Sequence, residues 1–369
     1  MLVKKILLAA GDRHGLLKVL PVYKALSEHD RYDAVLAAGS PLPKGERSGE
    51  DLPDLFGMHG DIVPIGGEGI SPVGRTASAM QEFEELLLAE QPDFLLVGGY
   101  DDIALSAALA ASKLGFAVAP FGAGMRDYNR NSPAEINRKI IDAVADILFV
   151  SEHSGEYNLI SEGFDEARIF FVGELAIDSL AAVIEKANSS TVTGDFGIEE
   201  KKYVLFLLDN PAAFDSDAAL KRVLRVVTSV ARDHQVLVLL GPDEGTIMQK
   251  HEMGEDFTTV PGVQVLPFPG YVELLRLVKD ALFVLTDSTL AQAESTVMKV
   301  PCLTMLDDTA SPATIEIGTN VLVGDREEDI LQAISEADLG EIGKKSKIPE
   351  KWDGDVTRRV IDVLDKVLE

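Results

Sequence analysis

The chain has 369 residues, and its 61 acidic and 34 basic side chains give a net charge of −27. This length exceeds one ordinary hydrophobic core and predicts two domains. A surface this acidic repels the phosphates of nucleic acids and anionic lipid headgroups, so neither nucleic acid nor membrane is an expected partner.

A single cysteine, Cys302, excludes an internal disulfide and is compatible with a reducing compartment. The apolar run 6–10 is too short for a secretory signal, so we expect a cytoplasmic protein. None of the 6 histidines pairs with another at metal-ligand spacing on one predicted element. We therefore expect no metal and no cofactor.

Short, nearly continuous apolar runs alternate with amphipathic segments along the first half. Such runs are typical of strands that are buried on both faces. The predicted strands are 5–10, 33–37, 94–97, 116–119, 147–150 and 168–172, and apolar stripes at helical spacing mark 80–87 and 136–144. The segment 40–70 is rich in Gly and Pro and is expected to be a long surface loop, with a lid as one role.

The second half repeats this alternation. Its predicted strands are 203–208, 235–240, 263–266, 281–285, 301–305 and 319–323, and its helices are 218–233, 271–279 and 290–298. Strand–helix alternation requires crossover connections and hence parallel sheets. The sequence predicts an α/β protein with two Rossmann-like parallel-sheet domains, 1–175 and 176–355, that face each other across a cleft. The last helix, 356–369, is expected to pack back on the first domain.

The first candidate site follows the first strand, because open parallel sheets bind ligands beyond the carboxyl ends of their strands. Gly11 beside a helix N-terminus would let backbone amides approach a phosphate, and Arg13 and Lys18 add positive charge. An ordinary strand-to-helix turn with a solvated Arg13 is the alternative. His14 at this strand end could act as an acid or base, or could simply face solvent.

The second candidate site is the segment 285–294. Asp287 or Ser288 fits the N-cap of the helix that starts here. The functional interpretation is that free backbone amides of Ser288 and Thr289 hold a phosphate. Glu294, two turns further on, could then reach the hydroxyls of a ribose.

A third group of candidates lies at 122–138. Arg126 and Arg138 are expected cations of the cleft. Ser132 and Glu135 match a capping box that has Pro133 at the first helical position, which would give Glu135 a structural role.

Taken in order, these segments resemble the non-hydrolysing UDP-N-acetylglucosamine 2-epimerases over most of the chain. The matching segments are 11–18 for G-T-R-P-E-x-x-K, 94–101 for a strand ending in H-G-D, 122–126 for E-A-G-L-R, 133–138 for P-E-E-x-N-R, 285–294 for L-T-D-S-G-G-x-Q-E-E, and 300–303 for K-P-V-L. The resemblance implies a glycosyltransferase-B-like fold, UDP or a UDP-sugar as ligand, and a homodimer. The substrate-binding residues that it implies are Gly11, Arg13, Lys18, Arg126, Arg138, Ser288, Thr289 and Glu294.

The family's reaction removes the proton at sugar carbon two and expels UDP. UDP is then added back, and carbon two regains a proton on its other face. These proton transfers need carboxylates near the sugar. Here the strand-end Asp of the family is replaced by Tyr100, the Glu of E-A-G-L-R by Gly122, and the first Glu of P-E-E by Ala134. Residues 208–211, Leu-Asp-Asn-Pro, stand where the family has a His-Arg-Arg-Glu segment. Residues 310–313, Ala-Ser-Pro-Ala, stand where it has a phosphate-binding E-R-P-E segment. The set that moves protons in the family is therefore almost wholly absent.

Three functions stay open from the sequence. The first is a UDP-sugar-binding protein with divergent chemistry, in which Asp101, Asp12 and His14 are the expected catalytic residues, with Tyr100 and Asp102 as further substitutes. The second is a catalytically inactive nucleotide-sugar-binding or partner protein on the same fold. The third is a glycosyltransferase of the same fold type, for which the sequence offers no acceptor or base signature.

Overall fold

The computed structural model describes residues 3–42, 51–58, 62–66, 71–209, 216–240, 254–338, 340–343 and 345–368. The chain forms two compact units. Unit 1 comprises residues 1–43, 50–182 and 350–369, and unit 2 comprises 44–49 and 183–349. Unit 1 is therefore built from both ends of the chain.

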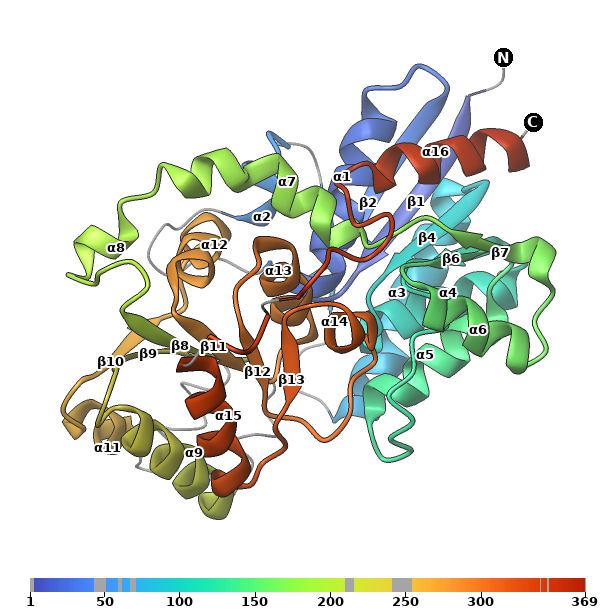
Figure 1. The fold of residues 1–369 in the computed structure, drawn as a ribbon. Coiled ribbons are helices and arrows are strands. Elements are labelled where there is room, and N and C mark those ends of the chain that lie inside the picture. Colours follow the sequence, from blue (N-terminus) through green and yellow to red (C-terminus); the bar gives the residue numbers. More distant parts are fainter. Residues whose placement is uncertain are drawn as a thin grey trace. The chain divides into compact units, whose positions relative to one another are not determined.

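Unit 1 contains a parallel sheet of five strands in the order β3-β2-β1-β4-β5 (Figure 1). The strands are β1 (Lys4–Ala10), β2 (Tyr32–Gly39), β3 (Val63–Ile65), β4 (Phe94–Gly98) and β5 (Ala117–Pro120). A second, two-stranded parallel sheet pairs β6 (Leu148–Val150) with β7 (Ile169–Phe171). The helices are α1 (Arg13–Ser27), α2 (Leu52–Leu55), α3 (Pro72–Glu90), α4 (Asp102–Leu114), α5 (Pro133–Val144), α6 (His153–Ser161), η1 (Glu166–Arg168) and α16 (Val356–Val367), and α7 (Leu175–Asn188) starts in unit 1 and ends in unit 2.

The core of unit 1 forms because β4 is buried along its whole length and β1 along most of it, as their unbroken apolar runs predict. One face of the sheet packs on α3 and α4 through a cluster that includes Phe83, Leu87 and Leu95. The last helix, α16, contacts α1 (Figure 1). At its start Asp178 of α7 accepts hydrogen bonds from the backbone N–H groups of Val356 and Thr357, at 3.1 and 2.6 Å.

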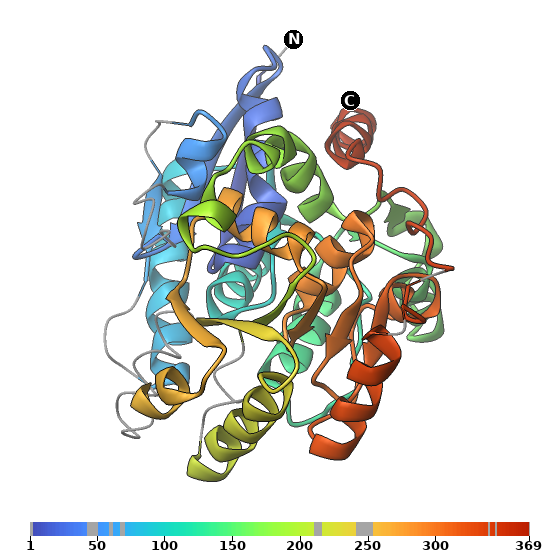
Figure 2. The same cartoon turned by 60° about the vertical axis from the view of Figure 1, so that its left-hand side comes forward.

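Unit 2 contains a parallel sheet of six strands in the order β10-β9-β8-β11-β12-β13. These are β8 (Tyr203–Leu208), β9 (Gln235–Leu240), β10 (Val263–Pro267), β11 (Phe283–Thr286), β12 (Cys302–Thr304) and β13 (Asn320–Leu322). The helices are α8 (Val192–Asp195), α9 (Asp217–Val230), α11 (Gly254–Thr259), α12 (Tyr271–Asp280), α13 (Thr289–Met298), α14 (Ala313–Glu316) and α15 (Glu327–Asp338). Helices α9 and α15 lie side by side (Figure 2) and share one apolar cluster with the sheet.

The predicted α/β class with two Rossmann-like parallel-sheet domains is confirmed. The expectation of a long surface loop at 40–70 is wrong where the structure describes this segment, because the short helix α2 and the edge strand β3 lie there and bury Leu52, Leu55 and Ile65. Strand β3 pairs with β2 through only three residues, one of them a proline, which a sheet tolerates at its edge. So short a strand leaves no periodic signal. Residues 43–50, 59–61 and 67–70 lie outside the described part.

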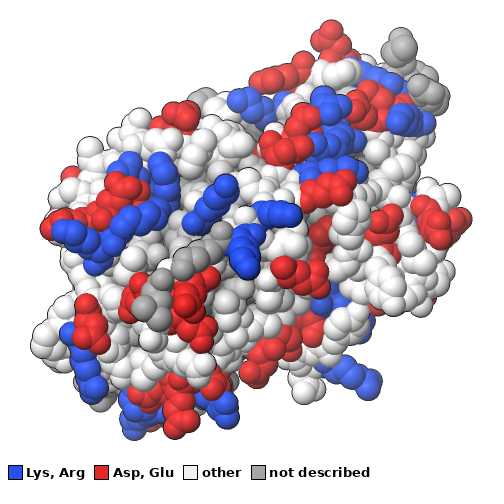
Figure 3. Space-filling view, viewed as in Figure 1, with Lys and Arg blue, Asp and Glu red and all other residues white. Residues whose placement is uncertain are grey.

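Charged side chains of both signs are interspersed on the face shown in Figure 3. Many are paired, as Arg358 is with Asp355 and Asp362 on α16. Within the described ranges, no helix combines the length and the apolar character that crossing a bilayer requires.

Candidate functional site

The turn between β1 and α1 lies tightly against the end of β4. Asp12 is the N-cap of α1, and its Oδ1 accepts a hydrogen bond from the Gly15 N–H at 2.7 Å. A Cβ atom at Gly15 would lie 2.5 Å from the carbonyl oxygen of Gly98. This position therefore needs glycine, and the two strand ends are held in close contact.

The turn between β4 and α4 brings a second carboxyl group to the same edge. Asp101 is the N-cap of α4, and its Oδ1 accepts from the N–H groups of Ile103 and Ala104 at 2.7 and 3.1 Å. A Cβ atom at Gly11 would lie 1.9 Å from this oxygen. A Cβ atom at Gly99 would meet Asp101 Oδ2 at 3.3 Å and Asp12 Oδ1 at 3.6 Å, so two of the three predicted catalytic residues converge here.

Burial, reinforced by the negative charge of Asp12, raises the pKa of Asp101 to about 7. Backbone hydrogen bonds from α4 only partly oppose this shift. Asp101 Oδ2 is enclosed and has no hydrogen-bond partner within the described part of the chain. Asp101 can therefore change its protonation near neutral pH, while its Oδ1 is engaged in capping α4.

We expect Asp101→Asn to remove a pH-dependent loss of stability. The folded pKa lies above that of the unfolded chain, so the native state holds a proton that the unfolded chain loses, and stability falls as pH rises from about 4 to about 7. Asn keeps the capping oxygen without the charge. At pH 8 the variant should be more stable by about 4 kcal/mol, and at pH 4 it should nearly match the parent. Urea titrations of the variant and the parent at both pH values check this. The same difference in unfolding free energy between the two proteins at pH 4 and at pH 8 would contradict it.

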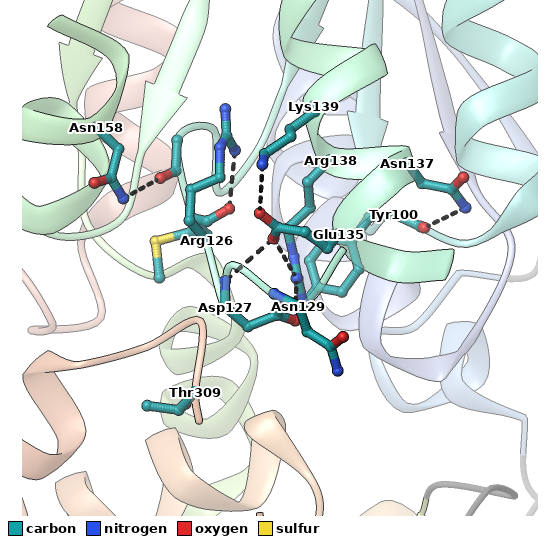
Figure 4. A network of polar contacts seen from close by, with 12 residues as sticks. Tyr100, Arg126, Asp127, Asn129, Glu135, Asn137, Arg138, Lys139, Asn158 and Thr309 are labelled. Atoms are coloured by element: carbon teal, nitrogen blue, oxygen red, sulfur yellow. Dashed lines mark hydrogen bonds and ion pairs between the residues drawn. The ribbon is translucent and has the colours of Figure 1, made fainter. Parts of the chain in front are cut away.

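Tyr100 lies between these carboxyl groups and α5, and two predicted site residues pack against it. The guanidinium of Arg138 lies over the phenol ring, with its central carbon 4.2 Å from the ring centroid. The His14 ring meets the Tyr100 ring edge to face at 5.6 Å. The Asn137 amide donates to the Tyr100 carbonyl at 2.9 Å (Figure 4). An aromatic side chain flanked by a cation and a histidine thus occupies the strand-end position.

The retained cations near Tyr100 are buried and paired. Lys18 forms an ion pair with Glu174 at 3.2 Å, and a Cβ atom at Gly122 would lie 3.2 Å from its Nζ. Burial acts to lower the pKa of Lys18, but the Glu174 carboxylate and Tyr100 more than offset it and leave that pKa raised. Arg138 pairs with Asp127 at 2.8 Å (Figure 4). The ammonium group of Lys18 thus occupies the space that a side chain at position 122 would enter.

His14 is surrounded by positive charge. Burial first, and then Lys18, Arg138 and Arg13, lower the pKa of His14 well below its ordinary value. The imidazole is therefore neutral at physiological pH, with one N–H donor and one acceptor nitrogen.

Arg126 belongs to a different environment. It pairs with Asp142 at 2.7 Å and with Glu162 at 2.8 Å, and it donates to the Met125 carbonyl. Its side chain is fully buried, and Figure 4 draws it in the same view as Tyr100. The structure thus gives Arg126 a packing and ion-pairing role inside unit 1 and does not bring it to the strand-end group.

The predicted capping box at the start of α5 is wrong. Ser132 is the N-cap, but its side chain makes no capping hydrogen bond. The Glu135 carboxylate instead accepts from the Asp127 N–H and pairs with Arg138 and Lys139 (Figure 4). Two cations hold a buried carboxylate more strongly than one backbone N–H does.

In unit 2 the predicted free amide of Ser288 is also wrong. This N–H donates to Thr286 Oγ1 at 3.0 Å, because the Thr286 side chain folds back toward the turn. The Ser288 hydroxyl caps α13 by accepting from the Ala291 N–H at 3.4 Å, and it donates to Asp209 Oδ2 at 3.1 Å. Thr289 follows as the first residue of α13.

The other unit 2 candidate, Glu294, is fully buried and accepts a hydrogen bond from the Tyr271 hydroxyl at 2.8 Å. Asp209 follows β8, and its N–H donates to Asp287 Oδ1 at 2.7 Å. Two carboxylates therefore flank Ser288 at this strand end. Sequence reasoning missed Asp209, Tyr271 and, in unit 1, Glu174 as partners of the predicted residues. The available signal for Glu174 was its place just after Gly173, in the turn that follows β7.

The sequence profile of the UDP-N-acetylglucosamine 2-epimerase family matches residues 65–365. The chain belongs to this family. A UDP-N-acetylglucosamine 2-epimerase of Methanocaldococcus jannaschii is 31% identical over 265 residues, which cover 70% of this chain and 72% of the relative. A UDP-2,3-diacetamido-2,3-dideoxy-D-glucuronate 2-epimerase of Pseudomonas aeruginosa is 28% identical over 89% of this chain and 91% of the relative.

Solved epimerase structures extend this agreement over nearly the whole chain. The Methanocaldococcus jannaschii UDP-GlcNAc 2-epimerase in complex with UDP-GlcNAc and UDP has a TM-score of 0.89 and 26% identity, and the match covers 98% of this chain and 99% of that one. The Neisseria meningitidis enzyme, at 21% identity and a TM-score of 0.86, shares the fold. The resemblance to this epimerase family and the glycosyltransferase-B-like fold are confirmed.

Proposed function

We propose that this chain binds a UDP-sugar and that its chemistry differs from the 2-epimerisation of its relatives. A relative with 26% identity was solved with UDP-GlcNAc and UDP bound, which supports the ligand class. The proposed difference in chemistry is carried by the groups that occupy two positions where the family has carboxylates, 100 and 122. Tyr100 is stacked under Arg138, and the ammonium of Lys18 lies where a side chain at 122 would project.

The catalytic roles proposed for Asp101, Asp12 and His14 rest on their shared sheet edge. Asp101 holds or releases a proton near pH 7, and the neutral imidazole of His14 can accept or donate one. Asp101 would have to leave the N-cap of α4 to reach a sugar, because both of its oxygens face the protein. This cost disfavours simple replacement of the lost carboxylates by Asp101.

A catalytically inactive nucleotide-sugar-binding protein is the second candidate. It is favoured by the capping roles of Asp12 and Asp101, each of which already completes a helix N-terminus. The family resemblance also supports the proposed homodimer, which sedimentation of the full chain tests.

One experiment tests the proposed ligand class and the divergence from the parent reaction. The protein is incubated with UDP-GlcNAc in D₂O, and NMR follows epimer, free UDP and deuterium at sugar carbon two, while calorimetry measures UDP binding. We expect UDP to bind and the parent epimer to be absent. Epimer with deuterium at carbon two would overturn the divergence. No binding of UDP or UDP-GlcNAc would overturn the proposed function.

We also expect Asp209→Asn to tighten UDP binding by about threefold to tenfold. Its carboxylate holds the Ser288 hydroxyl and repels a diphosphate at this strand end. The matched control is Asp233→Asn, an exposed carboxylate just before β9 and hence at the opposite edge of the parallel sheet. Equal UDP affinities for the two variants in calorimetry would show that the diphosphate does not approach Ser288.

A further inference from the structure

Two neutral groups with hydrogen-bond donors lie at the carboxyl ends of β1 and β4, backed by buried cations. Tyr100 and His14 are both half-buried, and their rings are in contact. Behind them, Lys18 is 3% exposed and Arg138 is 6% exposed, so neither cation is accessible but both act on this edge. A ligand at this edge would contact the phenol and the imidazole, and it would interact electrostatically with the buried charges of Lys18 and Arg138.

Cations gather close to His14 although the chain carries a net charge of −27. Burial first, and then the charges of Lys18, Arg138 and Arg13, act to keep the His14 ring neutral. Buried charges are screened far less by salt than surface charges are. In addition, Arg138 Nε is buried without a hydrogen-bond partner among the described residues, while the guanidinium as a whole also interacts with Tyr100.

Most of the carboxyl groups near this edge pair with a cation or cap a helix. Glu174 pairs with Lys18, and Asp127 and Glu135 pair with Arg138. Asp12 caps α1, and Asp101 is partly protonated near neutral pH. A carboxylate at position 100 would have added a full negative charge in contact with Arg138, which a phenol does not.

We propose that the sugar of the bound nucleotide carries a carboxylate, and that the Tyr100 hydroxyl and a His14 N–H donate hydrogen bonds to it. This substrate class rests on the proposed function. Two hydrogen-bond donors with cations close by suit an anionic acceptor, and an Asp at position 100 would repel it. Tyr100 is thus a specificity-determining residue.

The test compares UDP-glucuronate with UDP-glucose, which differ only in a carboxylate against a hydroxymethyl group. Calorimetry on the full chain should give at least about tenfold tighter binding of UDP-glucuronate. Tyr100→Asp should abolish or reverse this ratio, and Tyr100→Phe should reduce it severalfold. The control Tyr157→Phe, on an exposed side chain of α6, should leave the ratio unchanged.

Binding of UDP alone separates the two proposals. It should be the same in the parent and in all three variants, which also reports that they are folded. Absence of UDP binding in the parent would overturn the proposed function and this inference with it. UDP binding with no preference for UDP-glucuronate, or a preference that survives Tyr100→Asp, would overturn this inference and leave the proposed function standing.

Discussion

Replacement of Arg126 by methionine is expected to lower the free energy of unfolding of unit 1 by about 3–5 kcal/mol, because it leaves buried carboxylates without their cation. Arg126 pairs with both Asp142 and Glu162, and its side chain has no exposure. Asp142 is the more affected partner, because it is almost fully buried and also accepts from the Gly124 N–H.

Urea unfolding followed by circular dichroism measures this loss. The control is Arg358→Met, because Arg358 forms its ion pairs with Asp355 and Asp362 on the solvent side of α16 and should leave the midpoint unchanged. Combining Arg126→Met with Asp142→Asn should recover part of the stability, since the uncompensated charge is then removed. A single variant as stable as the parent would show that the cluster carries little energy.

The second large effect is expected for Asp178→Ala, which should release α16 from unit 1. The Asp178 carboxylate accepts from the N–H groups of Val356 and Thr357, and the side chain of the preceding Asp355 does not cap the helix. Leaving two such donors without an acceptor in the interior should cost about 2–4 kcal/mol.

Hydrogen exchange of residues 356–367 checks this directly, because their amides should exchange faster while those of unit 2 keep their rates. Asp178→Asn is the matched variant, since its side-chain oxygen still accepts one hydrogen bond and should retain much of the protection. Unchanged exchange in the alanine variant would mean that α16 is held by other contacts, such as those of Asp365 with Arg31 and Tyr32.

Much of the fold could be predicted from sequence because buried parallel strands carry a strong signal. The runs that became β1, β4 and β8 are apolar almost without interruption, and each is followed by turn residues. The edge strand β3 could not be predicted, because three residues that include a proline have no periodicity.

The candidate site was predictable in position but not in its internal contacts. The strand-end location of Gly11 and Asp101 follows from the topology of parallel sheets. The pairing of Lys18 with Glu174 joins residues 156 positions apart, and no local rule reaches that far. The contact of Ser288 was unpredictable for a different reason. The sequence cannot tell whether its backbone N–H donates to a phosphate or to a neighbouring side chain, and in the structure it donates to the Thr286 hydroxyl.

The discontinuity of unit 1 has a consequence for synthesis on the ribosome. Chain elongation delivers every strand of the first sheet early, yet α16, which contacts α1, is made only after unit 2. The nascent amino-terminal half must therefore wait, with part of its apolar surface uncovered, while the whole of residues 183–349 is translated. A chain that terminates before residue 350 would thus carry a finished second unit beside an incomplete first one, a natural target for chaperones and proteases.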